Sequence, residues 1–256
     1  MSFRSRSNGL LQWTGDLLRP SHLRVNARKV ANRLRRQHRS EAQDWAAGHA
    51  ESVEDFGNEV AADLWEETVA WAKAQKEDIR ARRPSDPYPM GGPGDYKLVY
   101  FLMRHLKPRV TIETGVAAGW TSQAILSAIE QNGFGRCYSS DLPYSTDPDA
   151  ISQIGRAVEE HLRGDWRLAV RGDRVNLAEF LSEITSLDFV HYDSDKSYAG
   201  RKWAMEKLSL PLSPSAVVVM DDIGDDTFFR DWTAARGGPF RVFHRGGPYY
   251  VGLVGL

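Results

Sequence analysis

Acidic side chains gather at two places in the C-terminal half of the chain, and each place directly follows a short apolar run. The residues concerned, together with one lysine, are Asp193, Asp195, Lys196, Asp221 and Asp222. If the two runs are neighbouring parallel strands, these carboxylates meet at one edge of a sheet, where they repel one another unless a cation lies among them. Magnesium favours such oxygen ligands. We therefore predict a divalent metal site, with magnesium as the expected ion, held by Asp193, Asp221 and Asp222.

Lys196 has two interpretations within this cluster. A metal ion beside it favours the neutral amine, which can accept a proton, so Lys196 is the candidate general base and Asp193 its catalytic neighbour. Asp195 would then orient the residues that hold the ion. In the plainer interpretation both acidic pairs cap helices, and Lys196 is their counterion.

A glycine-containing segment, 113–122, lies where another predicted strand meets a helix. Gly115 and Gly119 allow the backbone to approach a ligand closely, and ligands of open α/β sheets bind outside the carboxyl ends of the strands. The Gly-x-x-x-Gly spacing differs from the Gly-x-Gly-x-x-Gly that binds a dinucleotide pyrophosphate. Asp141 ends the next strand, where a carboxylate can bind a ribose. Turn formation and helix capping explain each feature alone, but together they favour a nucleoside ligand.

Both motifs depend on a strand–helix alternation that begins after a segment rich in proline and glycine, 86–95. Strands are expected over 110–114, 136–141, 166–170, 187–192 and 216–220, and helices over 98–106, 121–130 and 149–162. Such alternation indicates a parallel sheet covered on both faces. Two final runs, 240–244 and 249–254, flank a glycine turn and predict an antiparallel hairpin. The expected fold is therefore α/β, a Rossmann-like sheet of seven strands ending in an antiparallel hairpin.

The N-terminal part of the chain has a different pattern. Residues 1–40 are strongly basic and residues 41–80 strongly acidic, and both stretches show apolar residues at helical spacing. Ser52 is a candidate N-cap. We predict a helical extension over 1–85, a linker or cofactor-covering loop over 86–95, and the α/β domain over 96–256. The two helices either attract each other's charge in solvent, or the basic one contacts an anionic membrane surface peripherally, or they pair two copies of the chain in a homo-oligomer.

Composition limits the remaining possibilities. The formal net charge is −1, and Cys137 is the only cysteine, which excludes an internal disulfide and a cysteine-based metal cluster. The charge gives no reason to expect a nucleic-acid partner. No apolar run approaches the ~20 residues of a transmembrane helix, and the first residues lack the apolar core of a signal peptide. We therefore expect a cytoplasmic protein.

The segment 113–121, Glu-Thr-Gly-Val-Ala-Ala-Gly-Trp-Thr, resembles the first motif of class I S-adenosylmethionine (SAM)-dependent methyltransferases. It is closest to the version found in caffeoyl-CoA and catechol O-methyltransferases, and the resemblance extends from about residue 90 to the C-terminus. It implies SAM as cofactor. It also implies that Gly115 and Gly119 pass the methionine part of SAM, that Thr121 hydrogen-bonds near its carboxylate, and that Glu113 lies nearby.

The same resemblance assigns further site residues. Asp141 would bind the ribose hydroxyls, while Gly172 and Asp173 would line the adenine. The motif from Asp193 to Lys196, followed by Asp221-Asp222, resembles the metal motif of the same O-methyltransferases and also occurs in related bacterial methyltransferase-like proteins. Two departures stand out, because Tyr198 arrives one residue early and Asp222 replaces asparagine.

These observations predict a SAM-dependent, magnesium-assisted O-methyltransferase that acts on a hydroxyl of a small molecule or sugar. Three alternatives remain open. One is a nicotinamide-dependent oxidoreductase, which the missing dinucleotide motif and the terminal hairpin disfavour. The others are a non-catalytic SAM-binding or scaffold protein and a metal-independent methyltransferase.

Overall fold

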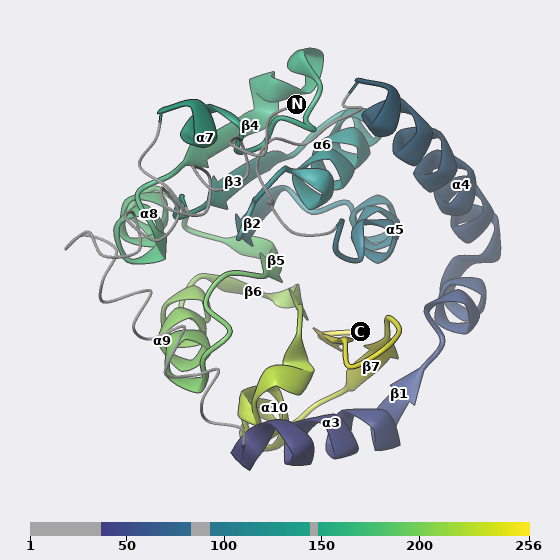
Figure 1. The fold of residues 1–256 in the computed structure, drawn as a ribbon, viewed down its shortest axis with the longest axis vertical. Coiled ribbons are helices and arrows are strands. Elements are labelled where there is room, and N and C mark those ends of the chain that lie inside the picture. Colours follow the sequence, from purple (N-terminus) through teal and green to yellow (C-terminus); the bar gives the residue numbers. More distant parts are fainter. Residues whose placement is uncertain (1–36, 83–92, 144–147) are drawn as a thin grey trace, which may run out of the picture.

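The computed structural model describes residues 37–82, 93–143 and 148–256 (Figure 1). In these residues a single eight-stranded sheet has the strand order β1-β7-β8-β6-β5-β2-β3-β4. Its strands are β1 Ala50–Glu51, β2 Val110–Thr114, β3 Arg136–Ser140, β4 Trp166–Ala169, β5 Leu187–Tyr192, β6 Leu212–Met220, β7 Phe240–His244 and β8 Tyr250–Val254. Neighbouring strands are parallel, except that β8 runs antiparallel to both β6 and β7. The predicted α/β fold with its terminal hairpin is confirmed.

The predicted count of seven strands is wrong, because a two-residue strand from the N-terminal region joins the sheet. β1 pairs parallel with β7, and Ala50 and Glu51 lie opposite Val242 and Phe243. Alanine and glutamate are good helix formers, so the sequence around them is typical of a helix. The outer side of β7 offers unpaired backbone groups, and pairing with these groups overrides the local preference.

Helices cover both faces of the sheet. They are α3 Gln37–His49, α4 Val53–Arg82, α5 Tyr96–Leu106, α6 Trp120–Asn132, α7 Pro148–Ser152, α8 Asp173–Leu181, α9 Tyr198–Leu208 and α10 Phe228–Arg236, with 3₁₀ turns η1 Glu160–Asp165 and η2 Ile223–Asp225. α4, α5 and α6 pack on one face, while α3, α8, α9 and α10 pack on the other (Figure 1). The two resulting cores keep the central strands away from water, as the alternating sequence pattern predicts.

The described part of the N-terminal extension packs on the α/β unit. In α4, Phe56 and Trp65 approach the ring of Phe101 at centroid distances of 6.1 and 5.4 Å, and Phe56 lies 5.0 Å from Phe243. Aromatic contacts of this kind bury a large apolar area. Ser52 caps α4 as predicted, because its hydroxyl accepts two backbone N–H groups of the first turn, each at 3.2 Å.

The single helix expected over 149–162 is wrong. α7 ends at Ser152, and the next regular element is η1. Gly155 has φ +68, and a Cβ atom there would lie 2.2 Å from the ring of Trp166. The segment instead pairs with the glycine loop, since the amides of Gly155 and Ala157 donate to the carbonyls of Ala117 and Ala118 at 2.9 and 2.8 Å. A contact distant in sequence thus replaces helical hydrogen bonds.

The basic helix and its predicted membrane contact lie outside the described residues, as does most of the segment 86–95. Within the described part of the chain, every helix is too short or too polar to cross a bilayer.

Candidate active site

The carboxyl ends of the central strands form one continuous edge. Beyond the strands the hydrogen-bond ladder continues for one more residue, because the amides of four residues donate to the last residues of neighbouring strands at 2.8–2.9 Å. These residues are Gly115, Asp141, Asp193 and Asp221. The parallel register therefore brings the glycine loop, the strand-end aspartate and both acidic motifs to the same edge of the sheet.

The two glycines of the loop are required by close packing. Gly115 has φ +84, and a Cβ atom there would lie 2.4 Å from the carbonyl oxygen of Asp193. Gly119 has φ +91, and its Cβ would lie 2.8 Å from the Cα of Gly155. Side chains at either position would push the loop away from β5 or from the segment after α7. The carboxylate of Asp141 holds the loop from the third side, because Oδ2 accepts the Ala117 amide at 2.7 Å.

The N-terminus of α6 faces the loop without a side-chain cap. Gly119 is the N-cap residue and makes no side-chain hydrogen bond to the first turn. An uncapped helix N-terminus carries partial positive charge and free N–H groups, which suit a carboxylate. Gly94 adjoins this point, because a Cβ atom there would lie 3.3 Å from Oγ1 of Thr121 and 3.7 Å from Oδ2 of Asp221. The described end of the segment 86–95 therefore lies against both the loop and the acidic cluster.

Glu113 lies beneath the loop and has no exposed surface. Its Oε2 accepts hydrogen bonds from the hydroxyls of Ser122 and Ser139, each at 2.6 Å, which ties the first turn of α6 to β3. Burial raises the pKa of Glu113 to about 7, although the two hydroxyls oppose the rise. Oε1 lies 3.9 Å from Nδ1 of His191, and neither atom has a hydrogen-bond partner among the described residues. Burial lowers the pKa of His191 to about 4.

Asp173 links the ends of two strands. Its carboxylate accepts from the hydroxyl of Ser140, the last residue of β3, at 2.7 Å and from that of Ser194, after β5, at 2.5 Å. Burial raises the pKa of Asp173, and the two serines oppose the rise. Gly172, with φ +87, precedes it and packs near the side chain of Leu142.

Lys196 bridges the two acidic motifs. Its Nζ contacts Oδ1 of Asp193 and lies 3.2 Å from Oδ2 of Asp222. The nitrogen is buried, and its contacts are ion pairs with these two carboxylates. Asp195 instead caps the turn before α9, because its Oδ1 accepts the amide of Ser197 at 3.0 Å. Of the predicted cluster, Asp193 and Asp222 are thus in contact with Lys196.

Arg201 of α9 is fully buried and contacts the second acidic motif, Asp221-Asp222, from the protein interior. Its Nη2 donates to the carbonyls of Asp221 and Asp222 at 3.1 and 2.7 Å, and Nη1 pairs with Asp226 at 3.3 Å. Asp222 has φ +53, a left-handed conformation that is costly for a non-glycine residue. The guanidinium stabilises this turn. Sequence reasoning missed Arg201, although its spacing from Ala204 places it on the buried face of α9.

A second arginine holds Asp221. Nη1 of Arg245, in the turn between β7 and β8, lies 2.7 Å from Oδ1 and 2.8 Å from Oδ2 of Asp221. Burial alone would raise the pKa of Asp221, but Lys196 and Arg245 outweigh it and lower that pKa below its usual value. The sequence suggested only a glycine turn at this point, and nothing in the local pattern reveals that the turn reaches β6.

The three residues of the predicted magnesium site are therefore held by two side-chain cations. Asp193 and Asp222 contact Lys196, and both oxygens of Asp221 contact Arg245. Across residues 37–82, 93–143 and 148–256, no three or more His, Cys, Asp or Glu side chains are grouped so that they could hold a metal ion. An ion on Asp221 would meet the guanidinium, which carries the same sign of charge. The donor set as arranged does not fit a divalent cation, and we derive no step through one.

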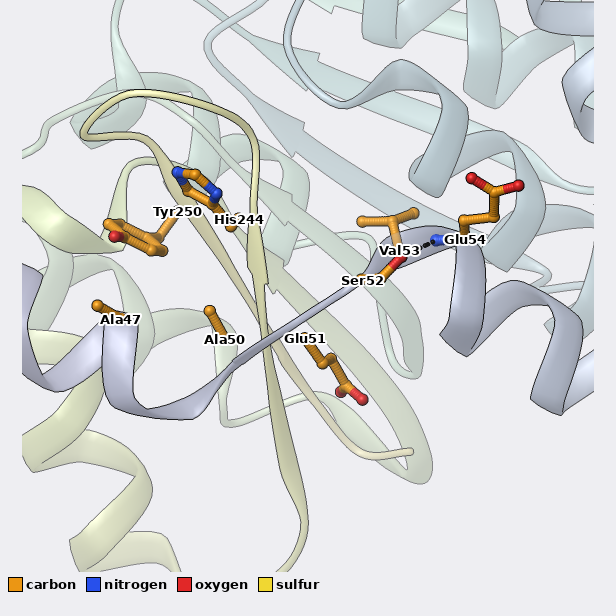
Figure 2. Close-up of a pocket in the computed structure, with 8 residues that line it drawn as sticks. All are labelled: Ala47, Ala50, Glu51, Ser52, Val53, Glu54, His244 and Tyr250. Atoms are coloured by element: carbon orange, nitrogen blue, oxygen red, sulfur yellow. Dashed lines mark hydrogen bonds between the residues drawn. The ribbon is translucent and has the colours of Figure 1, made fainter.

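A hollow of about 610 Å³ lies beside the hairpin at the same edge of the sheet (Figure 2). It is lined by Ala47, Ala50, Glu51, Ser52, Val53, Glu54, His244 and Tyr250. His244 and Tyr250, whose rings are 5.1 Å apart, lie opposite the junction of α3, β1 and α4.

Solved structures share this arrangement of strands and helices. The O-methyltransferase TomG from Streptomyces achromogenes, involved in tomaymycin synthesis and solved in complex with SAM, is 20% identical over 71% of this chain and 88% of its own, with a TM-score of 0.50. An O-methyltransferase from Bacillus cereus, solved in complex with SAH, is 18% identical over 80% of this chain and 97% of its own, with a TM-score of 0.48. The likeness to TomG shows that this chain shares the fold of a methyltransferase.

Residues 112–223 match a family model described as a methyltransferase domain. The matched segment runs from β2 to η2 and contains the glycine loop, Asp141 and both acidic motifs. This part of the chain is thus similar to a methyltransferase domain, in agreement with the class expected from the sequence. No curated protein matches the chain.

Proposed function

We propose that this protein is a SAM-dependent O-methyltransferase whose acceptor is a hydroxyl group of a small molecule or sugar. The observation that supports it is the convergence of the glycine loop, Asp141 and the Lys196 cluster at one edge of a methyltransferase domain. Such convergence brings a nucleoside-binding loop next to groups that can exchange a proton.

The residues along this edge suit SAM. The uncapped N-terminus of α6, with Thr121 in its first turn, would receive the methionine carboxylate. The carboxylate of Asp141, at the end of β3, accepts the amides of Ala117 and Leu142, and a carboxylate at this point of an α/β sheet can bind ribose hydroxyls. Gly172 and Asp173 would line the adenine. When bound, SAM supplies a methyl group on a positively charged sulfur.

Lys196 is the candidate proton acceptor. As the acceptor oxygen bonds to the methyl carbon and the carbon–sulfur bond breaks, the hydroxyl proton must leave, and a neutral Nζ can take it. Its ion pairs with Asp193 and Asp222 require the ammonium form, so Nζ must first give a proton to one of these carboxylates or to solvent. The loop, α6 and Asp141 contribute by holding the donor in one orientation, which is the larger part of the catalytic task.

The sequence also predicts magnesium assistance, because Asp193 and Asp221 follow the neighbouring strands β5 and β6 and are aligned by the extended ladder. The contacts of Arg245 with both oxygens of Asp221 favour the metal-independent version. Turnover in excess EDTA would distinguish the two.

The first test is a calorimetric titration of the purified chain with SAM. We expect one site per chain, and Asp141→Ala should weaken binding about 10- to 100-fold, the effect of losing one or two hydrogen bonds to a charged group. Glu206→Ala, which removes an exposed carboxylate on α9, is the matched control and should leave the affinity unchanged. Absence of SAM binding to the unaltered chain would contradict the proposed function.

A further inference from the structure

The terminal hairpin delivers a cation into the candidate active site. Arg245 directly follows β7, and its amide donates to the carbonyl of Tyr249 at 2.9 Å. Gly246 and Gly247, with positive φ angles of 96 and 57°, form the turn between Arg245 and Tyr249. β8 then pairs antiparallel with β6, with Gly252 opposite Met220. The turn therefore lies beside the residue that follows β6, which is Asp221.

The guanidinium contacts both carboxylate oxygens of Asp221, as a bidentately coordinated metal ion would. One nitrogen, Nη1, lies almost equally far from both carboxylate oxygens, at 2.7 and 2.8 Å. The side chain of Asp221 is 5% exposed and that of Arg245 22% exposed, so the contact is largely shielded from solvent. Burial lowers the pKa of Arg245, but Asp221, Asp95 and Asp222 outweigh it and raise that pKa. A guanidinium keeps its positive charge at any pH at which the protein is folded.

Side-chain cations offset most of the charge of the predicted metal-binding carboxylates without a metal ion. Asp193, Asp221 and Asp222 carry three negative charges, and Lys196 and Arg245 supply two positive ones within contact distance. The repulsion that would otherwise require a divalent ion is thus mostly relieved by side chains. Among the described residues, the hydrogen bonds of the Arg245 side chain all come from Nη1, so Nη2 and Nε can still donate.

We propose that Arg245 occupies the place of the divalent cation in this methyltransferase and donates a hydrogen bond to the acceptor oxygen, which makes methyl transfer independent of metal. The inference rests on the proposed function. A guanidinium keeps its charge and cannot accept a proton, so it can stabilise the developing oxyanion but leaves proton removal to Lys196. Asp221 orients the guanidinium, and the hairpin turn brings it to the site.

Mn²⁺ is a suitable test ion because it prefers the same oxygen ligands as magnesium and can be followed by electron paramagnetic resonance. We expect no stoichiometric Mn²⁺ binding by the full-length chain. Arg245→Ala should bind one Mn²⁺ at least about tenfold more tightly than the unaltered chain, because a like charge a few ångströms away is removed. Adding Asp221→Asn to that variant should abolish the gain.

The matched control is Arg241→Ala, which removes the arginine within β7, paired with Glu51 at 3.1 Å. It should leave Mn²⁺ binding as it is in the unaltered chain. Stoichiometric Mn²⁺ binding by the unaltered chain, lost in Asp221→Asn, would overturn the proposal. Failure of Arg245→Ala to gain a site would also overturn it, because the guanidinium would then not occupy a cation's place. SAM calorimetry on the same samples, with circular dichroism to check folding, tests the proposed function separately.

Discussion

Neutral hydroxyl groups hold the carboxylates on one side of the candidate active site, and cationic side chains hold those on the other. The glycine-loop side comprises the carboxyl ends of β2, β3 and β4, where Glu113 and Asp173 accept hydrogen bonds from serines. The acidic side comprises the ends of β5 and β6 and the hairpin turn, where Lys196 and Arg245 contact aspartates. Burial raises the pKa of Glu113 and Asp173, whereas Lys196 and Arg245 outweigh burial at Asp221 and lower its pKa.

This difference has a physical consequence. A hydroxyl group can donate to a carboxylate or accept from a carboxylic acid, so the glycine-loop side tolerates a change of protonation. An ion pair loses its attraction when either partner becomes neutral, and a buried charge without its partner is costly. Substitutions that remove charge should therefore lower stability more on the acidic side than on the glycine-loop side.

The largest effect is expected at Arg201, on the acidic side. Arg201→Met removes a fully buried cation and leaves Asp226 and the carbonyls of Asp221 and Asp222 without their donor. We expect the free energy of unfolding to fall by about 3–5 kcal/mol, the usual cost of breaking a buried ion pair. Urea denaturation measures it. Lys202→Met, on the exposed face of the same helix, should change stability by less than about 0.5 kcal/mol. Equal losses in the two variants would contradict the assignment.

The second effect concerns pH at the boundary of the two sides, where Glu113 of β2 faces His191 of β5. The pKa of Glu113 rises from 4.5 to about 7 on folding, so its contribution to stability falls as the pH rises from about 4.5 to about 7. The pKa of His191 falls from 6.5 to about 4, so its contribution rises as the pH increases from about 4 to about 6.5. The two contributions have opposite signs and nearly cancel where their pH windows overlap.

When one residue of the pair is replaced, the pH dependence of stability should reflect the other residue. Glu113→Gln should make stability increase with pH between about 4 and 6.5, by up to about 3 kcal/mol, because His191 is then the member of the pair that still titrates. His191→Asn should make stability decrease with pH between about 4.5 and 7. Thermal unfolding across this pH range measures both slopes, with the unaltered chain as reference. Slopes of the same sign in the two variants would show that the pair does not compensate.

The smallest effect comes from a matched pair of isosteric changes. Asp222→Asn on the acidic side leaves Lys196 with Asp193 alone and should lower stability by about 1 kcal/mol, as for a partly exposed ion pair. Asp173→Asn on the glycine-loop side should cost less, because its serine partners can reorient. Denaturation of the two variants under identical conditions decides the comparison. A larger loss in Asp173→Asn would mean that both sides depend on charge.

Local sequence signals predicted most of the glycine-loop side. Gly115, Gly119 and Asp141 stand out because strand ends and turn glycines are visible in a short window of sequence. The parallel register then brings them together without further information. The acidic motifs were found in the same way, since Asp193 and Asp221 directly follow apolar runs.

Contacts between distant segments account for what the sequence did not reveal. Arg245 reaches Asp221 only because β8 returns along β6, a pairing that no local pattern encodes. The helix expected over 149–162 gives way to contacts with the glycine loop, and β1 forms because β7 offers it a partner. In each case tertiary pairing outweighs helix propensity, which amounts to less than about 1 kcal/mol per residue for ordinary residues.

The short strand β1 also sets the order in which the molecule can be completed. Glu51 of β1 and Arg241 of β7 are 190 residues apart in sequence, yet they are paired across the edge of the sheet. During synthesis β2, β3, β4 and β5 emerge before β7 and can assemble first. β1 can pair only after β7 has been synthesised. Loop closure over such a separation is slow. β7, β8 and the turn that carries Arg245 are synthesised after the other strands, so the glycine-loop side can form before the acidic side receives its second cation.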